Sequence, residues 1–226
     1  MSDSLKQQAA LAALEEVRSG MVVGLGTGST VTHFIAGLGA RVRGGLAVRA
    51  IATSIRSETQ ARELGIPIIT FADEKALDLT VDGADEVSSD LDLTKGLGGA
   101  LVREKIVARA SRRFVVVVDD SKKVDRLGTR SPIPVEVVPF AGDIVCWDLA
   151  SIGGEPQLRI ANGAPFVSDN GNHVIDWHFG PIDEPAGLEQ DLKLITGVVD
   201  SGLFSHMADR VIVAGAGGLE SIERDA

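Results

Sequence analysis

The sequence predicts an α/β protein: a Rossmann-like, mostly parallel sheet with helices on both faces, plus a smaller inserted α+β domain of the ferredoxin-like type. Short apolar runs alternate with segments of helical periodicity over the first 128 residues, which is typical of a parallel sheet. The pattern changes near Gly128, where "GTRSPIPVEVVPF" contains three prolines. A buried strand returns in "DRVIVAGAGG" at 209–218. We therefore expect residues 1–128 and 205–226 to form the larger domain and residues 129–204 the inserted one.

Each element of the larger domain is predicted from a local pattern. Apolar residues recur at helical spacing from Leu5 to Val17, and Gly20 ends this helix. A second helix is expected at 57–65, with Ser57 as its N-cap and Gly65 after its end. Apolar runs and helical periods predict the remaining elements: strands at 21–26, 47–54, 66–71, 77–83 and 112–120, and helices at 31–42 and 99–111.

The inserted domain is predicted from a second alternation of strands and helices. Its proline-rich entry is expected to lead into an edge strand, because proline lacks the N–H that an inner strand needs. Strands are expected at 156–161 and 173–179, and helices at 141–153 and 184–197. Trp147 and Trp177 are expected in the core of this domain.

Composition excludes several classes of protein. The net charge is −10 and no basic cluster occurs, which argues against binding to nucleic acid or to an anionic membrane. The single cysteine, Cys146, excludes an intramolecular disulfide and a cysteine-based zinc cluster. The first twenty residues have the pattern of an amphipathic helix and not of a signal peptide, and no apolar run approaches the ~20 residues of a membrane span. We expect a cytoplasmic protein.

The glycine-rich segment "GLGTGST" at 24–30 follows a strand and opens a helix. Glycines let the backbone come close to a ligand, and the N–H groups at a helix start favour an anion. Ser29 and Thr30 add hydroxyl donors. The segment is neither a Walker A loop nor G-x-G-x-x-G. Phosphate binding is still preferred to the alternative of a plain tight turn, because of the glycines, the helix start and the hydroxyls.

Two aspartates close the strand "LTVDGADE". Asp82 and Asp85 flank Gly83 and Ala84, so a tight turn could direct both carboxylates into one cleft, where they would suit a polyol. The alternatives are an aspartate-rich turn that caps its own backbone and an oxygen-only magnesium site.

The third candidate segment is "KGLGGALVREK" at 95–105. Lys95 precedes a glycine loop, and Glu104 sits on the following helix, where it could act as a general base while Lys95 opposes charge on an oxygen. The alternative for Glu104 is a solvated helix residue. Lys122, just past a strand end, is a candidate second cation for a phosphate, and Lys6 is another, with a plain surface lysine as the alternative.

These motifs together resemble type A ribose-5-phosphate isomerase. The resemblance rests on "VGLGTGST", "VDGADE", "KGLGGALVREK", "VVDDSKKVDRLG", "PIPVEVVPF", "SDNGNHVID" and "GVVDSGLF", in one collinear order over essentially the whole chain. The DGADE and REK motifs are specific to that family. The resemblance implies interconversion of ribose 5-phosphate and ribulose 5-phosphate in the pentose phosphate pathway, without a cofactor and without a metal.

The resemblance also implies a role for each candidate residue. Glu104 is the base, Lys95 and loop N–H groups stabilise an oxyanion, and Asp82 and Asp85 orient hydroxyls. The chain departs from the usual three glycines after the loop lysine, because Leu97 stands between Gly96 and Gly98. The implied substrate contacts are Thr27, Gly28, Ser29, Thr30, Asp82, Gly83, Ala84, Asp85, Lys95, Gly96, Leu97, Gly98 and Lys122.

Two other functions would each explain only part of this sequence. A phosphosugar-sensing module would keep the glycine loop but would carry a basic DNA-binding helix pair, which this sequence lacks. A coenzyme A transferase-like enzyme would use Glu104 as a nucleophile and would leave Lys95 and the two aspartates without a role. The apolar strands of the inserted domain suggest a homo-oligomer, either a dimer or a tetramer.

Overall fold

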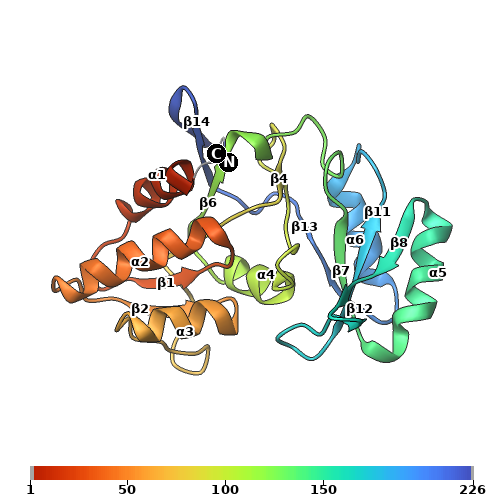
Figure 1. Ribbon diagram of the computed structural model, residues 1–226, viewed down its shortest axis with the longest axis horizontal. Coiled ribbons are helices and arrows are strands. Elements are labelled where there is room, and N and C mark those ends of the chain that lie inside the picture. The colour runs from red at the N-terminus through yellow and green to blue at the C-terminus, as the bar shows by residue number, and fades with distance from the viewer. Residues whose placement is uncertain (1–2, 225–226) are drawn as a thin grey trace. The chain divides into compact units, whose positions relative to one another are not determined.

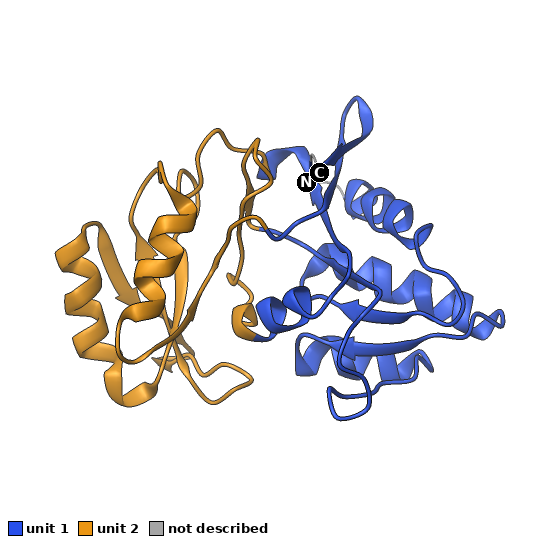
Figure 2. Cartoon of the chain, turned by 180° about the vertical axis from the view of Figure 1, so that it is seen from behind, with its two compact units in different colours: residues 1–84, 103–122, 207–226 blue, residues 85–102, 123–206 orange. Residues whose placement is uncertain are grey.

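The computed structural model describes residues 3–224, and the chain divides into two compact units (Figure 2). Unit 1 consists of residues 1–84, 103–122 and 207–226, and unit 2 of residues 85–102 and 123–206. Residues 85–102, which the sequence placed in the larger domain, therefore belong to unit 2. The chain passes from one unit to the other four times along its length.

Unit 1 is built on a six-stranded sheet with the order β15-β14-β6-β3-β1-β2 (Figure 1). All neighbouring pairs are parallel except β14 with β15, so the predicted mostly parallel sheet is confirmed. Residues 218–223 form an additional edge strand whose polar, exposed sequence gave no strand pattern. The bounds are β1 Val22–Leu25, β2 Arg49–Ala52, β3 Leu79–Asp82, β6 Phe114–Asp119, β14 Arg210–Gly215 and β15 Gly218–Glu223.

Helices cover both faces of this sheet. Side chains alternate along a strand, so Val23 and Leu25 of β1 face α1 and α2, whereas Val22 packs with Val107 of α4 on the opposite face. Gly24 allows this approach of α4, because a Cβ atom there would lie 2.7 Å from Val107. The helices of this unit are α1 Asp3–Leu14, α2 Ser29–Arg43, α3 Ile55–Glu63 and, from residue 103 onward, α4 Leu101–Arg109, with the 3₁₀ turn η1 at Asp120–Lys122.

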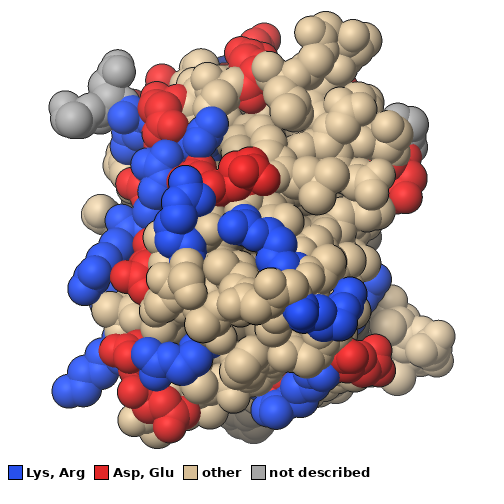
Figure 3. All heavy atoms as spheres, turned by 90° about the vertical axis from the view of Figure 1, so that its left-hand side faces the viewer, with Lys and Arg blue, Asp and Glu red and all other residues tan. Residues whose placement is uncertain are grey.

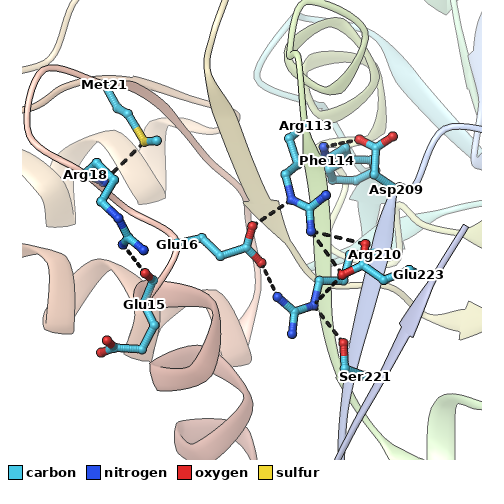
Figure 4. A network of polar contacts seen from close by, with 10 residues as sticks. All are labelled: Glu15, Glu16, Arg18, Met21, Arg113, Phe114, Asp209, Arg210, Ser221 and Glu223. Atoms are coloured by element: carbon cyan, nitrogen blue, oxygen red, sulfur yellow. Dashed lines mark hydrogen bonds and ion pairs between the residues drawn. The ribbon is translucent and has the colours of Figure 1, made fainter.

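A charged network ties the start of the chain to its end within unit 1 (Figure 4). Glu16, just after α1, accepts from Arg113 and Arg210 at 2.7 Å each, and Glu223 of β15 bonds both arginines. Burial alone would lower the pKa of Arg113, but the hydrogen bonds and charges of Glu16 and Glu223 raise it above its ordinary value. On the face drawn in Figure 3, acidic side chains lie between the basic ones.

Unit 2 contains the ferredoxin-like βαββαβ arrangement that the sequence predicts. Its antiparallel sheet has the order β12-β7-β11-β8 and carries α5 and α6. A second sheet has the order β13-β5-β4, and Lys95 directly follows its middle strand, β5. The bounds are β4 Glu86–Val87, β5 Leu93–Thr94, β7 Ile133–Val137, η2 Pro139–Ala141, α5 Gly142–Ile152, β8 Glu155–Leu158, β9 Ile160–Ala161, β10 Ala164–Pro165, β11 His173–His178, α6 Pro185–Leu194, β12 Val198–Ser201 and β13 Leu203–Phe204.

Several local expectations are wrong. Helix α3 begins one turn earlier than expected, because Ser54 and not Ser57 is the N-cap, accepting from the Ser57 N–H at 3.1 Å. Residues 66–71 make only an isolated bridge at Ile68. Strand β7 is an inner strand despite Pro134, because Gly202, just after β12, donates to the Pro134 carbonyl at 2.6 Å while its own carbonyl accepts from the Lys95 N–H and needs none from the proline. Trp177 is buried as expected, but Trp147 is 71% exposed.

Candidate functional site

The glycine-rich loop lies where the order of strands reverses in the unit 1 sheet. Strand β1 pairs in parallel with β2 on one side and β3 on the other, so the loops after β1 and β3 share the carboxyl edge of the sheet. Ligands of open α/β sheets bind at such a reversal. The Thr27 N–H donates to Asp82 Oδ1 at 2.9 Å, which joins the first two predicted motifs directly.

Asp82 is fully buried at the end of β3, and its carboxylate shapes the glycine loop. Oδ1 also accepts from the Gly83 N–H at 2.7 Å. Gly26 makes room for this carboxylate, because a Cβ atom at residue 26 would lie 2.2 Å from Asp82 Cγ. Asp82 points to the same face of the sheet as Thr80 and Gly24, and this is the face that α4 covers.

The start of α2 gathers hydroxyl and ammonium groups. Gly28 adopts φ +121°, which favours glycine, and Ser29 is the first helical residue. Lys6, a candidate cation for the phosphate, lies here, since its Nζ donates to Ser29 Oγ at 2.7 Å. Thr30 is half-buried in the first turn. This arrangement can hold an anion through helix N–H groups and one lysine.

A cluster of hydroxyls supports the glycine loop from β2 and α3, and sequence reasoning missed it. Thr27 Oγ1 lies 2.8 Å from both Thr53 Oγ1 and Ser54 Oγ, and Ser57 Oγ donates to the Gly26 carbonyl at 2.6 Å. The only signal was the run of small hydroxyl residues in "IATSIRSE", which flanks no recognisable motif.

Glu104 and Lys122 complete the candidate residues of unit 1. Glu104 is in the first turn of α4 and only 5% exposed, so the alternative of a solvated helix residue is wrong. Val107, one turn further along α4, packs against Val22 and Gly24 of β1 and so holds α4 against the sheet. Lys122 is half-buried in η1, three residues after the carboxyl end of β6.

Unit 2 carries the other half of the predicted set. Lys95 follows β5, is 2% exposed, and places Nζ 5.6 Å from the centre of the Phe204 ring, a cation–π arrangement. Asp85 is half-buried, and its Oδ2 accepts from the Leu97 N–H at 3.0 Å. Each aspartate of the DGADE motif therefore binds the backbone of a different loop: Asp82 the glycine loop, and Asp85 the lysine loop.

Leu97 fits the loop without backbone strain. Gly96 and Gly99 on either side adopt φ +104° and +79°, but Leu97 itself is not at positive φ. Its side chain is 43% exposed, so it points away from the interior of unit 2 while its N–H serves Asp85. The departure from three consecutive glycines thus falls at a position that tolerates a side chain.

Within residues 3–224, no three or more histidine, cysteine, aspartate or glutamate side chains gather in a geometry suited to a metal ion. None of the helices in this range is both long enough and apolar enough to span a bilayer.

Comparison with known proteins identifies the family. Residues 49–218 match the family model for ribose 5-phosphate isomerase A, also called phosphoriboisomerase A. A ribose-5-phosphate isomerase A from Gloeobacter violaceus is 50% identical over 225 residues, which covers 99% of this chain and 98% of that protein. The chain belongs to the ribose 5-phosphate isomerase A family. A homologue from Roseiflexus castenholzii is 49% identical over 99% of this chain and 97% of its own length.

Solved structures of ribose 5-phosphate isomerases have the same fold. One, in complex with phospho-erythronic acid, superposes with a TM-score of 0.97 at 39% identity and covers 99% of this chain and 100% of its own. Another, from Methanocaldococcus jannaschii, gives a TM-score of 0.94 at 41% identity over 99% of this chain and 100% of its own. As a member of this family, the protein is an enzyme of the isomerase class, and the resemblance seen in its motifs is confirmed.

Proposed function

We propose that this protein interconverts D-ribose 5-phosphate and D-ribulose 5-phosphate with Glu104 as the proton-transferring base, in the non-oxidative pentose phosphate pathway. The observation that carries the proposal is the buried carboxylate of Glu104, held in the first turn of a helix that packs on the sheet face onto which Asp82 points. Family membership supplies the substrate class.

The reaction needs one base that acts twice. Moving the carbonyl from C1 to C2 requires a proton to leave C2, which creates an enediolate, a hydroxyl proton to move from O2 to O1, and a proton then to arrive at C1. A single carboxylate can carry out both transfers at carbon if the intermediate stays bound between them. A buried carboxylate suits this role, because little water competes for the proton.

Charge on the substrate oxygens must be stabilised during these transfers. We assign this role to the buried ammonium of Lys95 and to the N–H groups of Gly96 and Gly98, because the N–H of Leu97 donates to Asp85. Asp82 and Asp85 would orient sugar hydroxyls, a role supported by their fixed positions against the two loops. The two aspartates would differ in the loop that each holds, since Asp82 fixes the glycine loop and Asp85 the lysine loop.

The phosphate group is assigned to the start of α2. Ser29 and Thr30 supply hydroxyls and helix N–H groups, Lys6 already contacts Ser29, and Lys122 is the second cation. Thr27 and Gly28 give the loop its shape. This assignment explains why an acidic protein can bind an anion, because the positive groups are local.

The test of the proposed base is Glu104→Gln, which keeps the shape of the side chain but not its basicity. We expect kcat to fall by about 10³–10⁴-fold, since a general base contributes roughly 10²–10⁴-fold and this one acts twice. Wild-type enzyme should wash solvent deuterium into C2 of ribose 5-phosphate, and the variant should not. Glu63→Gln, at an exposed position of α3, is the matched control and should leave both rates unchanged. Retained exchange in Glu104→Gln, with exchange lost in Asp82→Asn or Asp85→Asn, would assign the base to that aspartate.

Assembly and location are proposed on separate grounds. A homo-oligomer, dimer or tetramer, is supported by exposed apolar side chains along η2 and α5: Phe140 is fully exposed, and Ile144 and Trp147 follow it at helical spacing with 49% and 71% exposure. A cytoplasmic location is supported by the substrate class, because a charged sugar phosphate does not cross a bilayer unaided.

A further inference from the structure

Arg159 of unit 2 lies between β8 and β9, and its guanidinium reaches the lysine loop. One terminal nitrogen, Nη1, donates to the carbonyl oxygens of Gly96 at 3.1 Å and of Leu97 at 3.2 Å. No motif in the sequence singled out this residue. It belongs to a segment that follows the loop by some sixty positions along the chain, so only the fold brings the two together.

The other edge of the guanidinium is fixed by Asp176 of β11. Arg159 Nε donates to Asp176 Oδ2 at 2.9 Å, and Nη2 donates to Oδ1, so the two groups form a bidentate pair. The side chains are only 13% and 22% exposed. The ring of Phe166 packs against the guanidinium at 5.5 Å and also fills the space beside Gly99. Arginine is thus held rigidly, with its remaining donors directed at two carbonyls.

These contacts determine the direction of two peptide groups. In a trans peptide the C=O and the following N–H point in opposite directions. The Gly96 carbonyl points to Arg159, and the N–H of the same peptide, on Leu97, donates to Asp85. The Leu97 carbonyl also points to Arg159, so the next N–H, on the exposed Gly98, must point away from the arginine. The Gly96 carbonyl also accepts from the Gly99 N–H at 2.9 Å, so this turn and Arg159 together fix where the Gly98 N–H is presented, and Arg159 is the side chain that holds the Leu97 carbonyl.

We propose that Arg159 is a positioning residue for the isomerisation: it holds the carbonyls of Gly96 and Leu97 so that the loop presents the Gly98 N–H to the substrate oxygen that becomes negative. This inference rests on the oxyanion role given above to the N–H of Gly98. Asp176 acts one step further back, because it fixes the guanidinium that fixes the loop.

The primary test is Arg159→Lys, which keeps the positive charge and the apolar stem but loses the planar fork. An ammonium cannot bond Asp176 in a bidentate manner and hold both carbonyls as well. Removal of a complete oxyanion donor costs about 10²–10³-fold in kcat, so a misdirected donor should cost roughly 10–100-fold. KM for ribose 5-phosphate should change little, since the groups assigned to the phosphate belong to unit 1.

A binding measurement separates positioning from a merely structural role. Phospho-erythronic acid, the ligand of one related structure, has a carboxylate that resembles the two oxygens of an enediolate. Arg159→Lys should weaken binding of phospho-erythronic acid about tenfold or more, whereas its affinity for inorganic phosphate should stay at the wild-type value. Arg126→Lys is the matched control, because Arg126 pairs with Asp183 on the surface of unit 2 at 55% and 78% exposure.

A rescue experiment makes the result independent of loop stability. Arg159→Ala should regain part of its lost kcat when guanidinium ion is added at concentrations well below those that unfold proteins, and Arg126→Ala should not respond. Asp176→Asn is a second variant that keeps the arginine, and it should lower kcat in the same direction by a smaller factor. Folded Arg159→Lys and Asp176→Asn enzymes with wild-type kcat would overturn the proposal, as would an equal loss of affinity for inorganic phosphate. Absence of isomerase activity in the wild-type protein would instead overturn the proposed function.

Discussion

Glu86, the last residue of the DGADE motif, is 1% exposed and binds three backbone N–H groups. These belong to Gly128, Arg130 and Ser131, at 2.6, 2.6 and 2.8 Å. The buried Glu136 of β7 acts similarly, since its Oε1 accepts from the side chains of Ser168, Asn170 and Asn172. Buried carboxylates in unit 2 therefore hold irregular segments in place, a role that composition alone does not separate from catalysis.

Replacing Glu86 by glutamine tests this structural role. Glutamine keeps one acceptor oxygen but turns an NH₂ group toward backbone donors, so at least one charge-assisted hydrogen bond is lost. Such a bond contributes about 1.5–3 kcal/mol, and we expect the melting temperature to fall by roughly 4–10 °C for a chain of this size. Calorimetry is the measurement, and Glu184→Gln, at the exposed N-cap position before α6, where the side chain makes no cap hydrogen bond, is the control. An unchanged melting temperature would show that the three N–H groups are satisfied in another way.

Lys122 tests the assignment of the phosphate group. If its ammonium contacts the phosphate, Lys122→Ala should raise KM about ten- to a hundredfold, because a charge-assisted contact contributes roughly 1.5–3 kcal/mol. The value of kcat should stay close to that of the wild type. Steady-state assays of Lys122→Ala beside Lys75→Ala, an exposed loop lysine, separate the local contact from net charge. A lower kcat at constant KM would move Lys122 to the chemistry.

The cap of α3 links an element boundary to the glycine loop. Ser54 Oγ accepts from the Ser57 N–H, as an N-cap does, and the same oxygen lies 2.8 Å from Thr27 Oγ1. The start of α3 and the loop that approaches the substrate therefore depend on one hydroxyl.

Ser54→Ala is expected to cost about 1 kcal/mol of stability through the lost cap and to raise KM by loosening Thr27. Ser54→Thr keeps a hydroxyl in the same extended backbone conformation and should restore both properties. Thermal unfolding and steady-state kinetics measure the two effects. A stability loss with unchanged KM in Ser54→Ala would show that Asp82 and Thr53 hold Thr27 in place without Ser54.

Several elements show which features could be predicted from the sequence and which could not. Long apolar runs such as Phe114–Asp119 were predicted well, because burial on both faces of a parallel sheet leaves a continuous signal. The start of α3 was wrong, because Ser54 and Ser57 are both good caps and only the position of the glycine loop decides between them. Lys6 was a surface lysine by pattern, and its contact with Ser29 depends on the packing of α1 beside α2. Arg159 was not found, since its partners are remote backbone carbonyls.

At the scale of the whole molecule, the exposed apolar row of η2 and α5 bears on assembly. Trp147 was expected in the core but is 71% exposed, as is suitable for a surface that a second copy of the chain covers. We expect Trp147→Glu to shift the protein toward smaller species in size-exclusion chromatography with light scattering. Leu219→Glu, at a 52% exposed position of β15, is the control and should not alter the mass. An unchanged mass for Trp147→Glu would place the contact between copies elsewhere.

The position of β14 in the sheet has a consequence for synthesis of the protein. Strand β14 fills an inner place beside β6, yet residues 210–215 are translated only after residues 123–206 of unit 2. Until then, the apolar run Phe114–Asp119 has an open hydrogen-bonding edge, a feature that invites pairing with other chains. A nascent chain that stalls after unit 2 has emerged would therefore expose the unpaired edge of β6. We expect ribosome-bound fragments that end before residue 210 to bind chaperones.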